Sequence, residues 1–461
     1  MVKPAKSSSR TIFVCQNCGK ESLKWLGRCP NCQEWNSFEE TVVSTSAPSP
    51  IVDMSNPPRE LSQVATDSSD RLPLPLGELN RVLGGGLVSG SLVLMGGEPG
   101  IGKSTLLLQV SALVAQAGGK VAYVSGEETL SQIRLRAERL GVSGERLYLL
   151  AETDLNIILS HLEQLAPSLV VIDSIQAVSL PEMDATAGSV TQVRECTLRL
   201  MHWAKPGAVP VFVAGHVTKD GAIAGPRVLE HIVDVVLYLE GEPFSAYRVL
   251  RGVKNRFGST NEVGVFEMKQ EGLLEVDNPS KAFLSQRWDE AVGSAVVPTL
   301  EGSRPLLVEI QALNTPTAFG LPRRTANGVD FNRLLLITAV LTKRVGLKLG
   351  NQDIIVNVTG GLRIGEPAAD LGIALAIASS ARDISVDPQL VAAGEVGLSG
   401  ELRAVSQLER RVAEAARLGF ERCLVPKTSA QIKAPKNIKL LTAGTLREAI
   451  KLGLVGGKAK T

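Results

Sequence analysis

Long apolar runs are missing from this chain of 461 residues, and their absence limits what the protein can be. The longest apolar runs have only the length of a strand, so we expect no membrane span. The first residues contain no apolar signal core, which favours the cytoplasm. A formal net charge of +2 provides no global field, so a nucleic-acid partner would need local basic clusters. The length exceeds what one hydrophobic core supports and predicts about two to four domains.

Cysteine is also scarce, and most of it lies in the first 32 residues. Two C-x-x-C pairs stand there, formed by Cys15, Cys18, Cys29 and Cys32. Two such turns close a tetrahedral zinc site, and a segment this short needs the metal to fold. Disulfides or a redox pair are the alternatives, but a cytosolic chain disfavours the first and redox motifs rarely occur doubled. Cys196 and Cys423 are predicted to be buried as small apolar residues.

Basic and aromatic residues accompany the cysteine pairs. Lys24, Trp25 and Arg28 lie between the pairs, and Trp35 follows the second. This combination is typical of nucleic-acid contact, but packing of the tryptophans over the metal is an equal alternative.

A glycine-rich segment matches the phosphate-binding pattern G-x-x-x-x-G-K-[ST]. Its residues are Gly97, Glu98, Pro99, Gly100, Ile101, Gly102, Lys103 and Ser104, with Thr105 next. An apolar segment at 91–95 precedes it and a helical segment runs to residue 117, as this motif requires. Backbone N–H groups would hold the phosphates of ATP, Lys103 would reach the β- and γ-phosphates, and the Ser104 hydroxyl would hold Mg²⁺.

Alternating patterns around this loop predict an α/β fold. The expected strands are 120–125, 147–150, 169–173 and 210–215, and the expected helices are 130–140, 154–166 and 190–204. Such alternation specifies a parallel sheet covered by helices. The pattern then changes to a helix at 331–345, a strand at 353–358 and helices at 368–380 and 408–418, which predict a separate α+β domain.

The expected domains follow from these patterns. Residues 1–40 form the zinc module, and the Ser/Pro-rich residues 41–70 form a flexible linker. Residues 71–284 form the ATPase domain, and residues 285–461 form the C-terminal domain.

Carboxylates at strand ends are the candidates for hydrolysis. Asp173 ends an apolar strand and suits a second Mg²⁺ contact; the alternative is a cap on the following turn. Glu127 and Glu128 follow another strand, and one of them would activate the attacking water while the other is solvated. His216, Thr218 and Lys219 follow a third strand and suit either sensing of the γ-phosphate or a helix-capping or loop role.

A cationic segment follows later in the chain, with the residues Lys254, Asn255, Arg256, Phe257 and Gly258. Three interpretations stay open for its cations. They form a solvated edge, they contact nucleic acid, or they enter the ATP site of a neighbouring subunit.

These motifs together resemble the bacterial RadA (Sms) family of DNA-repair ATPases, over nearly the whole chain. The resemblance rests on the cysteine module, the phosphate loop, residues 125–129, residues 215–219 and the segment 254–258, which is the family's own signature. It implies a RecA-like ATPase core that acts with a recombinase on single-stranded and branched DNA, by branch migration or unwinding. A homo-oligomeric ring, expected to be a hexamer, and contact with a single-strand-binding protein or replicative helicase are implied as well.

The resemblance also implies roles for particular residues. Glu127 is the expected catalytic carboxylate, and Lys254 and Arg256 are expected to act across the subunit interface. The loops at 175–189 and after Lys219 correspond to segments that face DNA in RecA-like rings.

The C-terminal third resembles the proteolytic domain of Lon, which uses a Ser–Lys dyad. Asp370 stands at the serine position and Glu409 at the lysine position, so acyl transfer lacks a nucleophile and its base, and we expect no peptidase activity. Ser379, Ser380 and Ser399 do not align with the nucleophile. The domain is expected to be an assembly scaffold with a DNA-facing or merely solvated basic surface, formed by Arg323, Arg324, Arg333, Lys343, Arg344 and Lys348.

Two other functions compete with a DNA motor. The Lon-like third fits an ATP-driven protease or unfoldase, which the missing dyad opposes. The zinc module fits an adaptor whose ATPase is a switch.

Overall fold

The computed structural model describes residues 9–16, 18–44, 60, 62, 71–215, 229–241, 245–285, 287–288, 290–317, 320–429 and 432–455. The chain divides into two compact units. The first comprises residues 1–240 and 248–275, and the second residues 241–247 and 276–461.

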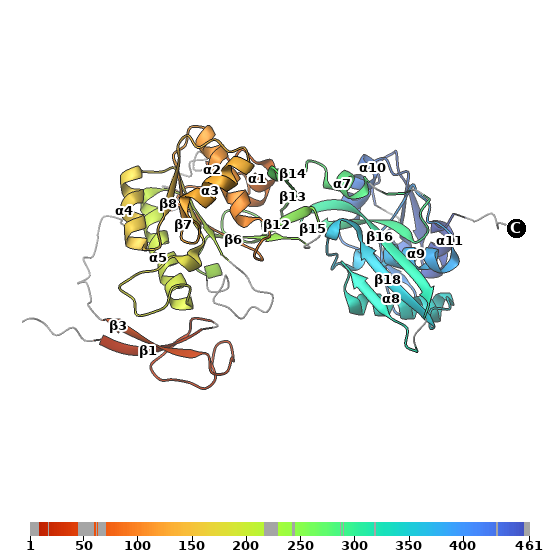
Figure 1. Cartoon of the computed structure of the whole chain (residues 1–461). Helices are drawn as coiled ribbons and strands as arrows, with labels where there is room; N and C mark the ends of the chain where they lie inside the picture. The colour runs from red at the N-terminus through yellow and green to blue at the C-terminus, as the bar shows by residue number, and fades with distance from the viewer. Residues whose placement is uncertain are drawn as a thin grey trace, which may run out of the picture. The chain divides into compact units, whose positions relative to one another are not determined.

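The N-terminal module is a small antiparallel sheet (Figure 1). Its strands are β1 (Ser9–Cys15), β2 (Glu21–Ser22) and β3 (Phe38–Ser44), in the order β2-β1-β3. β3 pairs with the whole of β1, so the module runs to residue 44 and beyond the expected limit at residue 40. Of the expected linker, the structure describes only residues 41–44, 60 and 62.

A nine-stranded sheet forms the centre of the first unit, in the order β14-β13-β12-β11-β6-β10-β9-β7-β8. The strands are β6 (Leu92–Gly96), β7 (Val121–Ser125), β8 (Leu147–Ala151), β9 (Leu169–Asp173), β10 (Val211–Ala214), β11 (Val235–Glu240), β12 (Tyr247–Asn255), β13 (Val263–Lys269) and β14 (Gly272–Glu275). The strands from β11 to β8 are parallel, as the alternation predicted. The antiparallel addition of β12 and β14 was not expected, because hairpin strands leave no helix between them to reveal the pattern.

Helices cover both faces of this sheet (Figure 1). One core contains residues of α1 (Gly77–Leu83), α2 (Lys103–Gln116) and α3 (Leu130–Arg139). The other contains residues of α4 (Leu155–Leu165) and α5 (Val190–Gly207). A short ladder of β4 (Arg71–Leu72) and β5 (Leu87–Val88) flanks α1 in the sequence.

Side-chain caps explain where several helices begin. Thr129 and Gln132 form a capping box at α3, Asp154 caps α4 and Ser189 caps α5. Each cap satisfies an N–H group that the first helical turn leaves without a partner. The helices therefore start within a residue or two of the predicted positions.

A seven-stranded mixed sheet forms the second unit, in the order β17-β18-β16-β15-β19-β22-β23. The strands are β15 (Ser294–Glu301), β16 (Arg304–Pro316), β17 (Arg324–Asn327), β18 (Gln352–Val358), β19 (Leu390–Ala392), β22 (Arg422–Pro426) and β23 (Lys439–Ala443). A separate hairpin joins β20 (Glu395–Val396) and β21 (Leu402–Arg403).

Helices lie on both faces of this sheet too. α10 (Leu408–Arg417) shares a core with Val296 and Leu307, whereas α9 (Asp370–Arg382) packs against the face that carries Val297. α8 (Phe331–Val340) and α11 (Leu446–Gly453) both contact α9. The predicted helix at 331–345 is α8 followed by one π-helical turn, Leu341–Val345.

The second unit begins earlier than residue 285, where the sequence placed it. α7 (Pro279–Leu284) packs on β16, and the Ser280 hydroxyl donates to Oε1 of Glu414 at 2.7 Å. These contacts attach residues 276–284 to the C-terminal sheet.

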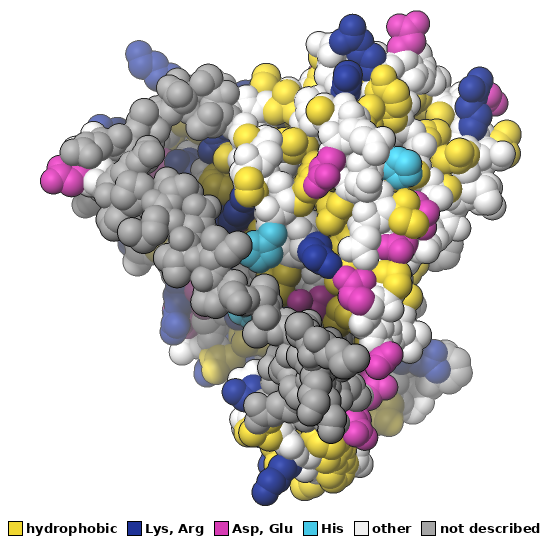
Figure 2. All heavy atoms as spheres, turned by 90° about the vertical axis from the view of Figure 1, so that its left-hand side faces the viewer, with side chains coloured by type: hydrophobic (Ala, Val, Ile, Leu, Met, Phe, Trp, Pro, Cys, Tyr) yellow, Lys and Arg dark blue, Asp and Glu magenta, His cyan; other side chains and the backbone are white. Residues whose placement is uncertain are grey.

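Charged side chains of both signs are interspersed on the face shown in Figure 2. This distribution agrees with the small net charge. Among the residues that the structure describes, no helix is both long and apolar enough to cross a bilayer.

Candidate functional site

The phosphate loop joins the end of β6 to the start of α2. Gly97 has φ 151° and Gly102 has φ 118°, which side chains rarely allow. A Cβ atom on Gly97 would lie 2.6 Å from the carbonyl oxygen of Leu239 on β11. The loop thus needs glycine, and the helix N-terminus behind it offers N–H groups to phosphate oxygens.

Lys103 is the buried first residue of α2. Its Nζ donates to the carbonyl oxygens of Gly97 at 2.8 Å and Glu98 at 3.0 Å. Burial lowers the pKa of Lys103, while the charges of Asp173 and Glu127 oppose that shift. A buried ammonium at this place suits phosphate, because a nearby anion favours the charged form of lysine that burial disfavours.

The remaining loop residues lie as the motif requires. Ser104 and Thr105 are partly buried in the first turn of α2, next to Lys103. The carbonyl oxygen of Ile101 accepts a hydrogen bond from Nε of Arg248 at 3.2 Å. Through this bond, Arg248 on β12 supports the loop as a second cation. Burial lowers the pKa of Arg248.

Asp173 is placed by the pairing of β9 with β7. Residue Ser125 pairs with Asp173 in this ladder, and Tyr123 pairs with Val171. The Tyr123 hydroxyl donates to Oδ2 of Asp173 at 2.5 Å. This donor is a hydroxyl group rather than a cation, so the pair places no counter-charge against the carboxylate, whose oxygens are of the type that Mg²⁺ prefers.

Glu127 and Glu128 have different partners. The Ser174 hydroxyl donates to Oε1 of Glu127. Glu128 forms an ion pair with Arg136 of α3. Glu127 is therefore the better candidate for activating water, since Glu128 is neutralised rather than solvated.

The segment 254–258 begins at the end of β12 and is held within its own chain. Nζ of Lys254 donates to the carbonyl oxygens of Glu230 and Val233, at 2.5 and 2.8 Å. Nη1 of Arg256 lies 3.2 Å from Oδ1 of the buried Asp234. Burial, followed by the charge of Arg256, lowers the pKa of Lys254.

The rest of that segment contacts β4 and the C-terminal end of α1. The Asn255 side chain donates to the carbonyl oxygen of Leu83 at 3.3 Å, and Arg71 donates to that of Phe257 at 2.8 Å. The Cβ position of Gly258 lies 3.6 Å from Cα of Gly84. These bonds give every cation and amide here a structural partner, beside any role in a neighbouring subunit.

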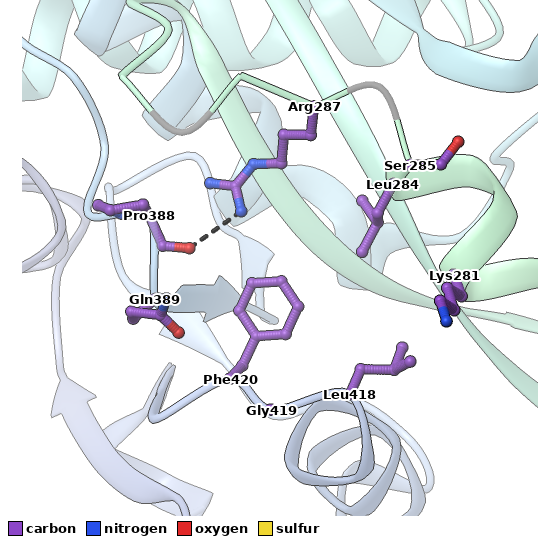
Figure 3. A pocket seen from close by; sticks show the side chains of 9 residues that line it. All are labelled: Lys281, Leu284, Ser285, Arg287, Pro388, Gln389, Leu418, Gly419 and Phe420. Carbon is purple, nitrogen blue, oxygen red and sulfur yellow. Dashed lines mark hydrogen bonds between the residues drawn. The ribbon is translucent and has the colours of Figure 1, made fainter.

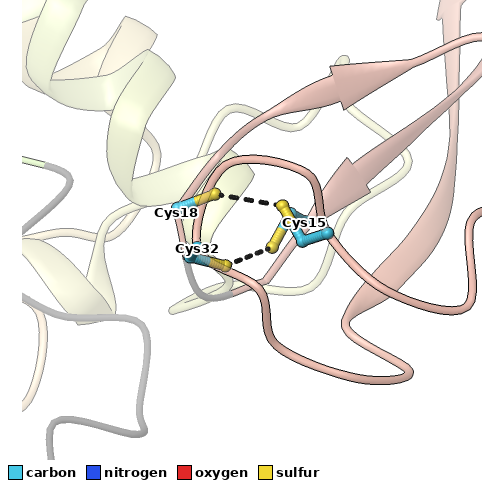
Figure 4. Close-up of side chains that lie close together, drawn as sticks. Cys15, Cys18 and Cys32 are labelled. Carbon is cyan, nitrogen blue, oxygen red and sulfur yellow. Dashed lines mark hydrogen bonds between the residues drawn. The ribbon is translucent and has the colours of Figure 1, made fainter.

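The four N-terminal cysteines gather as predicted, with their sulfur atoms all within 4.8 Å of one another. Cys15 and Cys32 are 3.5 Å apart, as are Cys18 and Cys29, and Figure 4 shows the thiols of Cys15, Cys18 and Cys32 directed toward one another. Four sulfur ligands at such separations fit a tetrahedral zinc ion.

The tryptophans of this module are exposed. Trp25 and Trp35 are 52% and 66% exposed, and the guanidinium of Arg28 lies 5.6 Å from the centre of the Trp35 ring. Packing over the metal, one of the two alternatives, would have buried them.

The positions expected for a Ser–Lys dyad have other partners. Asp370 is fully buried at the start of α9 and accepts from Nε of Arg333 at 2.7 Å and from the N–H of Val396 at 3.0 Å. Hydrogen bonding to Asp370 raises the pKa of Arg333. Glu409 is exposed and accepts from the N–H of Lys433 at 3.1 Å.

The hydroxyl groups of Ser379 and Ser380 form hydrogen bonds with backbone groups, and the backbone of Ser399 bonds to a side chain. Ser379 donates to the carbonyl oxygen of Ile384 at 2.5 Å, and Ser380 accepts from the N–H of Asn314 at 2.9 Å. Ser399 lies in the turn between β20 and β21, where its N–H donates to Glu401 at 3.1 Å.

The expected basic surface of the second unit is smaller than the sequence indicated. Arg333 is paired with Asp370, and Arg324 donates to the carbonyl oxygens of Gln352 and Leu349. The exposed members of the set are Arg323, Lys343, Arg344 and Lys348.

A pocket of about 380 Å³ opens in the second unit, away from these residues. Figure 3 shows Arg287 pointing toward Pro388 and Phe420; it donates to the Pro388 carbonyl oxygen at 2.9 Å and lies 5.8 Å from the Phe420 ring centre. Lys281 and Gln389 also line it.

Other predicted residues have varied outcomes. His216, Thr218 and Lys219 lie outside the described residues, as does the loop that follows them. The loop at 175–189 begins with a 3₁₀ turn, Ile175–Ala177. Cys196 and Cys423 are buried, and burial raises the pKa of each thiol to about 12.

Comparison with known proteins agrees with this arrangement. Residues 57–222 match the AAA domain, residues 13–40 the rubredoxin metal binding domain, and residues 311–429 subunit ChlI of Mg-chelatase. The DNA repair protein RadA of Listeria monocytogenes is 52% identical over 454 residues, which cover 98% of this chain and 99% of that protein. The chain belongs to the RadA family of DNA repair proteins.

A second RadA protein gives a similar match. RadA of Bacillus subtilis is 51% identical over 459 residues, which cover 98% of this chain and 100% of that protein. A KaiC-like protein from Pyrococcus horikoshii overlaps 45% of this chain and 98% of its own, with a TM-score of 0.38 and 20% identity. The three family matches, rather than this overlap, show that the chain combines a zinc ribbon, a RecA-like ATPase core and a Lon-like C-terminal domain, as the sequence predicted.

Sequence reasoning missed the hydroxyl groups that hold the two carboxylates, Tyr123 and Ser174. The signal was present but weak, since Ser174 directly follows Asp173 and Tyr123 lies four residues before Glu127. It also missed the pairing of Arg333 with Asp370, because the two residues are 37 positions apart.

Proposed function

We propose that this RadA-family ATPase is a DNA-dependent motor of recombinational repair. It hydrolyses ATP with Mg²⁺ while processing single-stranded and branched DNA by branch migration or unwinding, together with a recombinase. The phosphate loop carries this proposal, because it follows β6, and Asp173 and Glu127 lie at the same ends of the parallel strands β9 and β7 of that sheet.

Each group has a defined task in this mechanism. ATP supplies the phosphoryl group, and Mg²⁺ neutralises charge on its phosphates when bound. Lys103 and the loop N–H groups hold the β- and γ-phosphates, while Ser104 and Asp173 would hold the metal. Glu127 accepts a proton from the attacking water.

The assembly is proposed to be a homo-oligomeric ring, expected to be a hexamer, in the cytoplasm. Lys254 and Arg256 would reach the ATP of a neighbouring subunit, which requires Lys254 to exchange its carbonyl acceptors for phosphate oxygens. The zinc ribbon would contact the recombinase, a single-strand-binding protein or a replicative helicase.

Peptidase activity is not part of the proposal. The carboxylate at the nucleophile position is buried and bound to Arg333, and a carboxylate with its charge engaged in this way does not attack a peptide. Incubation of the protein with ATP and unfolded casein should therefore leave the casein intact.

The decisive experiment measures ATP hydrolysis with and without single-stranded DNA. Lys103→Ala should lower turnover by at least about 100-fold, because electrostatic stabilisation of the phosphates is lost. Lys269→Ala, which removes a half-exposed lysine at the end of β13, is the matched control and should keep normal turnover. Normal turnover in Lys103→Ala would refute the site, whereas turnover indifferent to DNA would favour an adaptor with an ATPase switch.

A further inference from the structure

Two hydroxyl groups connect the strands that carry the proposed catalytic carboxylates. Tyr123 on β7 donates to Asp173 at the end of β9, at 2.5 Å. Ser174, the residue after β9, donates back to Glu127, which follows β7. Each strand therefore holds the carboxylate of the other.

Both hydroxyl groups lie in the interior. Tyr123 is 0% exposed and Ser174 is 1% exposed. A buried O–H group needs an acceptor, and for each of these two the acceptor is a carboxylate in the ATPase site.

A neutral donor is suited to this place. A hydroxyl group fixes the orientation of a carboxylate without cancelling its charge, whereas Glu128 beside it is neutralised by Arg136. Groups that hold a metal-binding or proton-accepting side chain in place typically affect affinity or activity by about 10–100-fold.

We propose that Tyr123 and Ser174 form a reciprocal clamp that positions the two carboxylates: Tyr123 orients Asp173 for Mg²⁺, and Ser174 orients Glu127 for the attacking water. This inference rests on the proposed function, which assigns those tasks to Asp173 and Glu127. It predicts that the two halves of the clamp fail in different ways.

Loss of the tyrosine hydroxyl should affect the metal. In Tyr123→Phe, the gain in affinity for a fluorescent ATP analogue on adding Mg²⁺ should fall about tenfold, while affinity in EDTA stays unchanged. Mn²⁺, which binds such ligands more tightly, should restore part of the gain. Tyr148→Phe on β8, where Tyr148 is 46% exposed, is the matched control and should behave as the parent protein.

Loss of the serine hydroxyl should affect turnover. Ser174→Ala should bind the analogue normally in Mg²⁺ and in EDTA, but hydrolyse ATP about tenfold more slowly. Ser174→Thr retains the hydroxyl and should recover most of the rate. Urea unfolding of each variant shows whether the fold is intact.

Asp173→Asn separates the clamp from the function on which it rests. If Asp173→Asn loses the Mg²⁺ gain but Tyr123→Phe keeps it, Asp173 is the metal ligand and the clamp is wrong. If Asp173→Asn also keeps the increase in affinity on adding Mg²⁺, then Asp173 is not the metal ligand, and the proposed role of Tyr123 is wrong as well. A rate in Ser174→Ala equal to that of the parent protein would refute the second half of the clamp.

Discussion

Asp173 in the first unit and Asp370 in the second are carboxylates at the edge of a secondary-structure element, yet their surroundings differ. Asp173 ends a strand and accepts a hydrogen bond from a neutral tyrosine. Asp370 begins a helix, is fully buried, and accepts from an arginine and a backbone N–H group. The first is hydrogen-bonded to a neutral side chain, whereas the second forms an ion pair with a cation.

The difference shows that the partner of a carboxylate decides its role. A neutral donor orients the group and leaves it reactive, whereas a guanidinium converts it into a structural connection between two helices. Arg333 on α8 and Asp370 on α9 form that connection in the second unit.

The largest test of this comparison removes the arginine. Arg333→Met should lower the free energy of unfolding by about 3–5 kcal/mol, because Asp370 would remain buried without its counter-charge. Urea unfolding followed by circular dichroism measures the change.

A double variant provides the control. Arg333→Met combined with Asp370→Leu removes both charges and should recover most of the lost stability. A loss below about 1 kcal/mol in the single variant would show that the pair is not a structural connection.

The second test exchanges Asp173 for a neutral amide. Asp173→Asn should lower ATP turnover by about 100-fold, equivalent to about 2.7 kcal/mol, because an amide does not supply the charge that Mg²⁺ needs. The unfolding free energy should fall by less than in Arg333→Met, since Asp173 is hydrogen-bonded to a neutral tyrosine and the buried Lys103 keeps the nearby charge of Glu127.

Asp370→Asn is the opposite case. It should lower stability but leave the turnover of the folded protein intact. Equal losses of stability in the two variants would remove the distinction between the two sites.

A third test concerns a cation that donates to carbonyl oxygens. Lys254→Met should lower the unfolding free energy by about 1 kcal/mol, because the carbonyl groups of Glu230 and Val233 lose a charged donor. DNA processing should fall at least about tenfold if Lys254 also acts on a neighbouring subunit. Normal DNA processing with lowered stability would leave the lysine a purely structural role.

The smallest effect is expected at an exposed pair. Arg134 and Glu138 lie one turn apart on α3, and their side chains are 74% and 56% exposed. Arg134→Ala should change the unfolding free energy by no more than about 0.5 kcal/mol, because water and salt screen such pairs. A loss of unfolding free energy above about 2 kcal/mol would contradict the expectation that an exposed ion pair contributes less stability than the buried pair of Arg333 and Asp370.

Local patterns in the sequence predicted much of this molecule. The phosphate loop, the cysteine pairs and the alternating strands and helices are set by neighbouring residues, so the loop at Gly97 and the end of β9 at Asp173 were located correctly. Helix limits followed from caps such as Thr129 and Asp154.

Contacts between distant residues were not predictable in this way. β12 pairs antiparallel with β11, and β14 antiparallel with β13, and such pairs have no helix between their strands to mark them in the sequence. Arg333 looked like a surface cation because its sequence neighbours do not reveal Asp370. The intramolecular partners of Lys254 were hidden for the same reason, since they lie more than 20 residues away.

The Arg333–Asp370 pair also bears on how this domain can change over generations. A serine at position 370 would leave the partly exposed Arg333 with the carboxylate of Glu395, which lies 3.8 Å from its Nη2, whereas loss of Arg333 would leave the buried aspartate without a counter-charge. Losing the arginine first would cost a large part of the roughly 5–15 kcal/mol that stabilises a typical domain. The order of substitution therefore matters: a change at Asp370 before a change at Arg333 is the less destabilising way to replace the pair.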